Sequence, residues 1–319
     1  MNIFVTGTAG FIGSHLAGAL LDEGHSVVGF DNFNDYYSVR LKRARHALLT
    51  GRKGYTGIEG DLCDATLLGK IFSEQRFDAV CNLAAQAGVR YSLSHPLAYQ
   101  KSNLEGFLNI LEACRHAKVP RLVYASSSSV YGGNTKLPFS ESDPVDKPIS
   151  LYAATKKANE LMAHTYTHLF GLQTVGLRFF TVYGPWGRPD MALWLFTEAM
   201  LAGRPIQVFN HGRMRRDFTY VDDIVAGVKA SLLRPGLAPY EVLNLGNHNA
   251  ENLMDMIGVL SKSLGVEPKT EFLPMQAGDV EATYADITQA EAKLGFRPTT
   301  SIALGIPKFV KWYRDYHKL

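Results

Sequence analysis

A tyrosine and a lysine four residues apart, Tyr152 and Lys156, have side chains that together could move a proton. Ser150 is a plausible N-cap of the helix that would carry them, and residues i and i+4 share one helix face. An ammonium beside a phenol, near a positively charged nicotinamide, would favour the phenolate and bring the pKa of Tyr152 into a range useful near neutral pH. The same pattern also occurs as an ordinary surface pair, so its position decides its meaning.

A run of serines, residues 126–129, lies upstream of this pair and directly after the predicted strand Leu122–Ala125. Hydroxyl groups at a strand end can donate hydrogen bonds to an oxygen that is being oxidised. A serine-rich turn without chemistry is the alternative. The hydroxyls of this run are therefore the predicted partners of the tyrosine and the lysine.

A glycine loop, Gly7-x-x-Gly10-x-x-Gly13, separates the predicted strand Asn2–Thr6 from a helical pattern that ends at about Glu23. Glycine at the first position permits a tight turn, at the second a close approach to a pyrophosphate, and at the third close helix packing. The N-terminus of the helix then faces the anion. A structural turn is the alternative interpretation, and the spacing differs from the common GxGxxG.

Asp31 ends a second predicted strand, Ser26–Phe30. A carboxylate there can accept hydrogen bonds from both ribose hydroxyls of adenosine and repel a 2′-phosphate, which favours NAD over NADP. A turn or N-cap aspartate is the alternative. Asp61 could bond the adenine amino group. The basic run 40–45 is interpreted as a solvated helix face.

The predicted elements place these motifs at one sheet edge. Further apolar strands, Ala79–Leu83 and Thr174–Leu177, alternate with predicted helices over 104–117 and 151–169, which indicates a parallel sheet covered on both faces. After residue 180 the alternation loosens. We expect an α/β fold in which a Rossmann-type doubly wound parallel sheet carries a smaller mixed α/β substrate-binding domain. The expected ranges are 1–180 with a return segment at about 219–247 for the first, and 181–218 with 248–319 for the second.

Composition agrees with an enzyme of about two domains. The chain has 319 residues, of which 46% are hydrophobic, and a net charge of +3, too small for a nucleic-acid binding footprint. The three cysteines form no CxxC pair, which favours a reducing cytoplasm. No apolar run reaches the length of a membrane span, and because strand-like residues begin at Asn2 we expect no targeting segment. His164 and His168 lack the glutamate of a zinc-binding HExxH motif, so no metal is expected.

Together these motifs resemble the extended short-chain dehydrogenase/reductase family, the NAD-dependent nucleotide-sugar epimerases and dehydratases, which use GxxGxxG. The runs 31–37, 86–92 and 178–192 are similar to its UDP-glucuronate 4-epimerase subgroup. The resemblance implies tightly bound NAD, a UDP-uronate substrate, and a homodimer paired through the helices near 104–117 and 151–169. The cofactor contacts it predicts are Gly7, Gly10, Phe11, Ile12, Gly13, Asp31, Asn32, Asp61, Leu62, Leu83, Ala84, Ala85, Tyr152 and Lys156.

The resemblance implies that Ser127, with Ser128 beside it, is the catalytic serine that acts with Tyr152 and Lys156. The residues after Ser127 separate the reactions of this family. By resemblance, 4,6-dehydratases carry Asp-Glu directly after the catalytic Ser/Thr, and uronate decarboxylases carry a Glu two residues after it; here Ser128 and Ser129 stand at those positions. Without a carboxylate, elimination lacks its acid/base pair, which leaves epimerisation at C4 through a 4-keto sugar. A UDP-glucose 4-epimerase, a dehydratase and a non-catalytic NAD sensor remain alternatives.

The resemblance also implies substrate contacts. The 4-keto uronate is a β-keto acid, so an epimerase must hold its carboxylate out of alignment with the carbonyl; Thr181 and Arg188 are assigned this task. Arg216 resembles the diphosphate-binding arginine of the family. The predicted set is Arg90, Ser127, Ser128, Thr181, Arg188, Gln207, Arg216 and Asp279, the last within Gln-Ala-Gly-Asp where relatives can show Arg-x-Gly-Asp.

Overall fold

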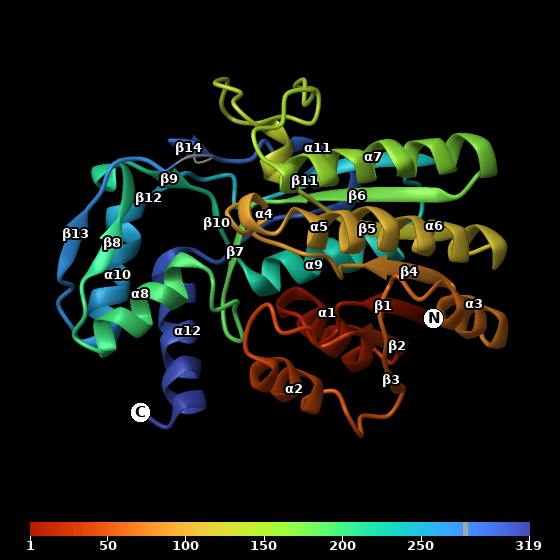
Figure 1. Ribbon diagram of the computed structural model, residues 1–319, viewed down its shortest axis with the longest axis horizontal. Helices are drawn as coiled ribbons and strands as arrows, with labels where there is room; N and C mark the ends of the chain where they lie inside the picture. Colours follow the sequence, from red (N-terminus) through yellow and green to blue (C-terminus); the bar gives the residue numbers. More distant parts are fainter. Residues whose placement is uncertain (277–279) are drawn as a thin grey trace.

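A seven-stranded parallel sheet forms the centre of the computed structural model, which describes residues 1–276 and 280–319 (Figure 1). The strand order β11-β6-β5-β4-β1-β2-β3 places β1 inside the sheet, and every neighbouring pair is parallel. The predicted strands are confirmed. The bounds are β1 (Asn2–Thr6), β2 (Ser26–Asp31), β3 (Tyr55–Glu59), β4 (Ala79–Asn82), β5 (Arg121–Ser127), β6 (Gln173–Phe179) and β11 (Tyr240–Leu245).

Helices cover both faces of this sheet, as buried apolar strands require. In β1, Ile3 and Val5 pack with α1 and α9, whereas Phe4 packs with α3, α6 and part of α7. The main helices are α1 (Phe11–Asp22), α2 (Val39–Ala47), α3 (Ala65–Glu74), α6 (Gly106–His116), α7 (Leu151–Phe170) and α9 (Val221–Leu233). Short helical segments are α4 (Tyr91–Ser94), α5 (Pro96–Tyr99), a π-helix η1 (Gln100–Glu105) and a 3₁₀ turn η2 (Ser128–Tyr131).

A second lobe lies beside the carboxyl edge of the sheet (Figure 1). It contains three small sheets, β10-β7, β12-β9-β14 and β13-β8. Their strands are β7 (Thr181–Tyr183), β8 (Ile206–Val208), β9 (Arg215–Arg216), β10 (Phe218–Tyr220), β12 (Glu251–Asn252), β13 (Thr270–Phe272) and β14 (Ala282–Thr283). The helices of this region are α8 (Ala192–Leu201), a 3₁₀ turn η3 (Phe209–Gly212), α10 (Leu253–Leu264) and α12 (Ile302–His317), whereas α11 (Thr288–Leu294) packs against β11 and α9 of the central sheet (Figure 1).

The basic run 40–45 is only in part the solvated face that we expected, because Arg40 and Arg43 are exposed whereas Lys42 and Arg45 are not. Arg45, on α2, is fully buried, and its Nη2 donates hydrogen bonds to the carbonyls of Trp186 and Gly187 at 2.7 and 2.8 Å. Lys42 is buried as well and donates to Asn34. These cations are satisfied by oxygen acceptors inside the protein, and Arg45 joins α2 to the segment that follows β7.

Two further findings concern the described parts of the chain. None of the helices there is long and apolar enough to cross a membrane. Within the same residues, no group of three or more His, Cys, Asp or Glu side chains could hold a metal ion.

Candidate active site

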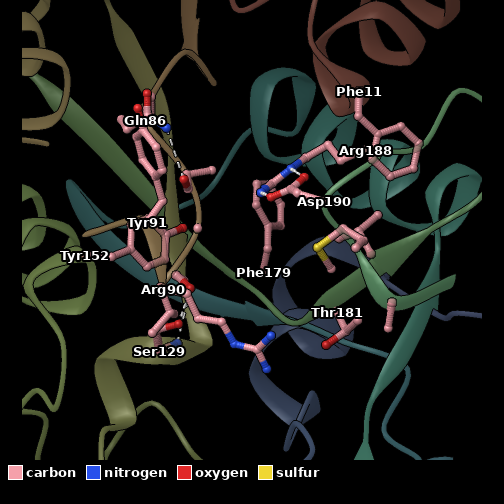
Figure 2. A pocket seen from close by; sticks show the side chains of 18 of the residues that line it. Phe11, Gln86, Arg90, Tyr91, Ser129, Tyr152, Phe179, Thr181, Arg188 and Asp190 are labelled. Carbon is pink, nitrogen blue, oxygen red and sulfur yellow. Dashed lines mark hydrogen bonds and ion pairs between the residues drawn. The ribbon is translucent and has the colours of Figure 1, made fainter. Parts of the chain in front are cut away.

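A cleft of about 1270 Å³ runs along the carboxyl ends of the central strands and continues into the second lobe. This edge is where ligands bind in open parallel sheets, because the loops after the strands converge there. Figure 2 shows side chains from both lobes facing the cavity, among them Tyr152 and Ser129 on one side and Arg188 and Asp190 on another.

The glycine loop after β1 lines one part of this cleft. Gly7 has a φ of +76°, and a Cβ atom there would lie 2.8 Å from the backbone nitrogen of Ala84. A Cβ atom on Gly13 would lie 2.0 Å from the Gly7 carbonyl oxygen. The N-cap of α1, Gly10, supplies no side-chain hydrogen bond, so the first N–H groups of the helix stay available to an anion. The loop therefore fits a pyrophosphate.

Asp31 lies at the carboxyl end of β2 and lines the cleft. Its Oδ2 accepts a hydrogen bond from the backbone N–H of Ala9, and its Oδ1 accepts one from that of Phe33, each at 2.9 Å. These two bonds fix the carboxylate and leave each oxygen a second lone pair. That arrangement suits the two hydroxyls of a ribose.

Asp61 follows β3 and also lines the cleft. Its Oδ2 accepts a hydrogen bond from the amide of Asn32 at 3.0 Å, and its Oδ1 accepts one from the backbone N–H of Cys63. Burial would raise the pKa of Asp61, but these hydrogen bonds outweigh it and hold the pKa below its usual value. The group is therefore ionised and oriented at neutral pH.

The Tyr-Lys pair lies in the first turns of α7. The Ser150 hydroxyl accepts a hydrogen bond from the backbone N–H of Ala153, which confirms the predicted N-cap. Tyr152 and Lys156 both line the cleft, and the Lys156 ammonium donates to the carbonyl of Ala125 in β5 at 2.9 Å. Helix and strand thus hold the two side chains beside the serine run.

Burial dominates the electrostatics of this pair. It raises the pKa of Tyr152, and the nearby Ser127 hydroxyl and Arg188 guanidinium lower it only in part. It also lowers the pKa of Lys156 to about 8. The lowered tyrosine pKa that we predicted for the pair beside a nicotinamide cation is therefore not produced by the surrounding protein groups.

A buried ion pair between Arg178 and Glu160 is hydrogen-bonded to the end of β5. The Nε and Nη2 of Arg178 donate to the two oxygens of Glu160 at 2.8 and 2.9 Å, and Ser126 donates to the same carboxylate at 2.7 Å. The Nη1 of Arg178 donates to the Tyr131 hydroxyl, which in turn donates to Asn244. This closed network fixes the backbone next to Ser127.

A second arginine, Arg188, lies in the cleft itself. Its Nε donates to Oδ1 of Asp190 at 3.0 Å, its Nη2 donates to Oδ2, and the Tyr36 hydroxyl donates to the same Oδ2 at 3.0 Å. Burial would raise the pKa of Asp190, but the charge of Arg188 outweighs it and keeps the pKa below its usual range. Tyr36 and Asp190 are residues of this site that sequence analysis missed; both stand in runs that carried the family resemblance, without an assigned role.

The cleft collects almost every residue that the sequence singled out. In the described part of the chain, all the predicted cofactor contacts and the substrate contacts Arg90, Ser127, Ser128, Thr181, Arg188, Gln207 and Arg216 line it. Asp279 lies outside the described residues. Their individual roles stay predictions.

Comparisons with known proteins agree with this geometry. Residues 3–246 match the model of the NAD dependent epimerase/dehydratase family. A UDP-glucuronate 4-epimerase of Arabidopsis thaliana is 50% identical over 332 residues, which cover 99% of this chain and 77% of that protein. The crystal structure of a UDP-glucuronic acid 4-epimerase from Bacillus cereus, in complex with UDP-glucuronic acid and NAD, is 36% identical, covers 99% of this chain and 100% of that one, and has a TM-score of 0.94. A UDP-glucose 4-epimerase from Thermotoga maritima, solved with UDP-glucose, is 31% identical with a TM-score of 0.89, over 99% and 100% of the two chains.

The chain belongs to the NAD-dependent epimerase/dehydratase family. Its cofactor is NAD, and the cleft fits it: a Cβ-free cradle at the helix N-terminus for the pyrophosphate, and the oriented Asp31 carboxylate for the adenosine ribose. The resemblance to this family that the motifs predicted is confirmed, as is the Rossmann-type α/β fold.

Proposed function

We propose that this protein is a 4-epimerase that interconverts UDP-glucuronate and UDP-galacturonate. The observation that carries the proposal is one cleft lined by the Tyr152–Lys156 pair, a serine run without a directly following carboxylate, and an arginine, Arg188. The first two features suit oxidation at C4 without elimination, and the third suits a uronate.

Tyr152 takes the proton of the C4 hydroxyl, and Ser127 and Ser128 supply hydroxyl groups to the same oxygen. Lys156, on the same helix α7, orients the phenol of Tyr152. NAD, when bound, supplies the hydride acceptor at C4 of its nicotinamide and a positive charge beside the phenol. The 4-keto sugar then turns about its diphosphate link, presents its other face, and receives hydride and proton back with inverted configuration.

The carboxylate that acts on Tyr152 from within the site is that of Asp190, which raises the pKa of the tyrosine. Asp190 already accepts hydrogen bonds from Arg188 and Tyr36 and has a lowered pKa. It is therefore a poor proton donor near neutral pH, and Ser128 and Ser129 stand where a 4,6-dehydratase would carry its carboxylate pair. This supports epimerisation over dehydration.

The remaining substrate contacts belong to the proposal. Thr181, on β7, and Arg188 hold the C6 carboxylate, and Arg90 and Arg216 hold the diphosphate. Gln207, on β8, contacts uracil or its ribose, and Asp279, which lies outside the described residues, is proposed for the same part of the substrate. The division into an NAD-binding unit (1–180 with 219–247) and a sugar-binding unit (181–218 with 248–319) is proposed as well; β11 lies in the central sheet beside β6, which supports the return segment.

A homodimer is also proposed. The adjacent helices α6 and α7 expose the apolar side chains Leu108, Leu161 and Leu169, which keep 41%, 58% and 61% of their surface accessible. Pairing of these helices with those of a second copy would cover them. We expect sedimentation to give twice the chain mass, and Leu161→Glu to give monomers. A cytosolic location stays a prediction, supported by free thiols at Cys63, Cys81 and Cys114.

The activity is tested by incubating the purified holoenzyme with UDP-glucuronate and separating the products by chromatography. We expect UDP-galacturonate, and a preference of at least about a hundredfold in kcat/KM over UDP-glucose, since Arg188 has no partner on a neutral sugar. Tyr152→Phe, which keeps the ring and removes the hydroxyl, should lose roughly 10³-fold in kcat. Equal turnover of UDP-glucose, or an undiminished Tyr152→Phe enzyme, would contradict the proposal.

A further inference from the structure

The contact between Arg188 and Asp190 leaves one side of the guanidinium available. A guanidinium can bind carboxylates along two edges, a side edge formed by Nε and Nη2 and an end edge formed by Nη1 and Nη2. Asp190 takes the side edge, since Nε and Nη2 donate to its two oxygens. In the part of the chain that the structure describes, no acceptor takes the Nη1 protons of Arg188. Arg188 can therefore keep Asp190 and bind a second carboxylate end-on.

Tyr36 adds a third point to this arrangement from a different loop. It belongs to the loop after β2, whereas Asp190 follows β7, and the two are 154 residues apart in sequence. Burial and the charge of Asp190 raise the pKa of Tyr36, so its phenol stays a neutral donor. Figure 2 shows Arg188 and Asp190 side by side within the cleft. We call Tyr36, Asp190 and Arg188 the bracket.

We propose that Asp190 and Tyr36 are positioning residues that aim the end edge of Arg188 at the C6 carboxylate of a UDP-uronate, and that this orientation keeps the 4-keto intermediate from losing CO₂. The inference rests on the proposed function and adds two residues to it. Neither residue needs to touch the reacting atoms; each acts through the direction in which Arg188 points.

The chemistry explains why direction matters. In the 4-keto uronate the C5–C6 bond can break, with its electron pair forming the C4–C5 enolate; CO₂ leaves and C5 then takes up a proton. This requires the C5–C6 bond to align with the carbonyl π system. A bidentate guanidinium holds the plane of the carboxylate and stabilises its charge, which dissipates as CO₂ departs. A guanidinium that is free to rotate would hold the carboxylate plane less firmly and stabilise its charge less.

The geometry also allows an opposite role, in which Asp190 occupies the place of the substrate carboxylate and is displaced by it. The two roles predict opposite signs. If Asp190 positions Arg188, loss of its charge weakens uronate binding. If Asp190 is a competitor, the same substitution strengthens binding, because the substrate no longer has to displace it.

The test compares wild-type holoenzyme with Asp190→Asn and Tyr36→Phe, with Asp35→Asn as the matched control. Asp35 is an exposed carboxylate next to Tyr36 in the same loop, so its substitution removes a charge without entering the bracket. For each protein the measurements are KM and kcat with UDP-glucuronate, the fraction of UDP-pentose in the product, and the inhibition constant of UDP, which carries no carboxylate.

We expect Asp190→Asn to raise KM for UDP-glucuronate about tenfold and Tyr36→Phe about threefold, with a larger UDP-pentose fraction in both. The inhibition constant of UDP should stay within about twofold, and Asp35→Asn should match the wild type. An unchanged or lower KM, or a parallel rise in the inhibition constant of UDP, would overturn the inference.

Two further outcomes separate this inference from the proposed function. Wild-type protein that converts UDP-glucuronate while both variants behave like it would overturn the positioning role alone. Wild-type protein that fails to convert UDP-glucuronate would overturn the proposed function and this inference with it. Should Asp190→Asn fail to fold, Tyr36→Phe gives the decision, because it deletes one hydroxyl and keeps the charges.

Discussion

Two arginine–carboxylate pairs of this protein share one contact geometry and differ in their surroundings. Arg178 and Arg188 each donate Nε and Nη2 to the two oxygens of a carboxylate, that of Glu160 and that of Asp190 respectively. The side chains of the first pair are 4% and 1% exposed, and the Tyr131 hydroxyl accepts a hydrogen bond from Nη1 of Arg178. The side chains of the second are 24% and 28% exposed, and in the described part of the chain Nη1 has no acceptor.

The difference teaches how one motif serves two purposes. Where each nitrogen of the guanidinium has an acceptor and the pair is buried, the pair holds structure, and removing one partner is costly. Where one edge of the guanidinium faces a cleft, the pair orients a group for something that is yet to bind. Six substitutions can break or sharpen this contrast.

The largest effect is expected for Glu160→Gln. It leaves the buried charge of Arg178 without its counter-ion, which should cost about 3–5 kcal/mol in the free energy of unfolding. Asp190→Asn, in the part-exposed pair, should cost less than about 1 kcal/mol. Denaturant unfolding of both variants measures the difference. Similar losses in the free energy of unfolding would show that the two pairs stabilise the fold to the same extent.

Lys156 is a buried cation for which the described residues supply no carboxylate partner, so its removal should raise the free energy of unfolding instead of lowering it. Burial lowers its pKa to about 8 from an ordinary 10.5. Between these pH values the unfolded chain holds a proton that the folded protein lacks, so stability should rise with pH in that window. Below about pH 8 the cost of the buried ammonium is present in full.

Lys156→Met should therefore stabilise the protein near pH 7, by at most about 3 kcal/mol, while abolishing epimerisation. It should also flatten the rise in stability between about pH 8 and 10.5. Unfolding free energies over this pH range measure both effects. A destabilised variant would show that the lysine is held for the fold and not for the chemistry.

A smaller loss is expected for Tyr131→Phe. The Tyr131 hydroxyl accepts a hydrogen bond from Nη1 of Arg178 and donates one to Asn244. Its removal leaves both of these buried groups short of a partner, which should lower the free energy of unfolding by about 2 kcal/mol. The matched substitution Tyr36→Phe, in the cleft, should change stability by less than about 0.5 kcal/mol. Thermal and denaturant unfolding should rank the two in this order; the reverse order would contradict the contrast.

The smallest effect is expected for a third pair with the same fork, Arg115 and Glu112 on α6, whose side chains are 31% and 37% exposed. Hydrogen bonds from Arg115, and then from Tyr166, lower the pKa of Glu112 from 4.5 to about 2. The contribution of this ion pair to the free energy of unfolding is present above about pH 4.5 and is lost as the pH falls toward 2. Because solvent screens the two charges, this contribution stays below about 1 kcal/mol, and Glu112→Gln should lower the free energy of unfolding at pH 7 only slightly. A loss as large as that for Glu160→Gln would show that burial is not what matters.

Local patterns were enough to predict the sheet and the positions of the motifs. Short apolar strands followed by glycine or aspartate, such as Asn2–Thr6 before Gly7, indicate parallel strands whose ends carry a binding loop. The spacing of Tyr152 and Lys156 within one helix fixes their common face without any tertiary information. These parts of the site follow from residues that are neighbours in sequence.

The parts that were missed depend on partners far away in sequence. Arg45 looked like a member of a solvated charge run, but its acceptors, the carbonyls of Trp186 and Gly187, lie 141 and 142 residues further on. The contact of Tyr36 with Asp190 spans 154 residues. Helical periodicity gives no signal for either contact, because each arises only when the second lobe packs against the loops of the sheet.

The most direct test of the central claim is to follow UDP-glucuronate with the holoenzyme in D₂O by NMR. Removal and return of hydride at C4, without acid/base chemistry at C5, predicts UDP-galacturonate whose C4 and C5 hydrogens both come from the substrate, with no UDP-pentose. Deuterium at C5, release of CO₂ as the main course, or a failure to form UDP-galacturonate would contradict it.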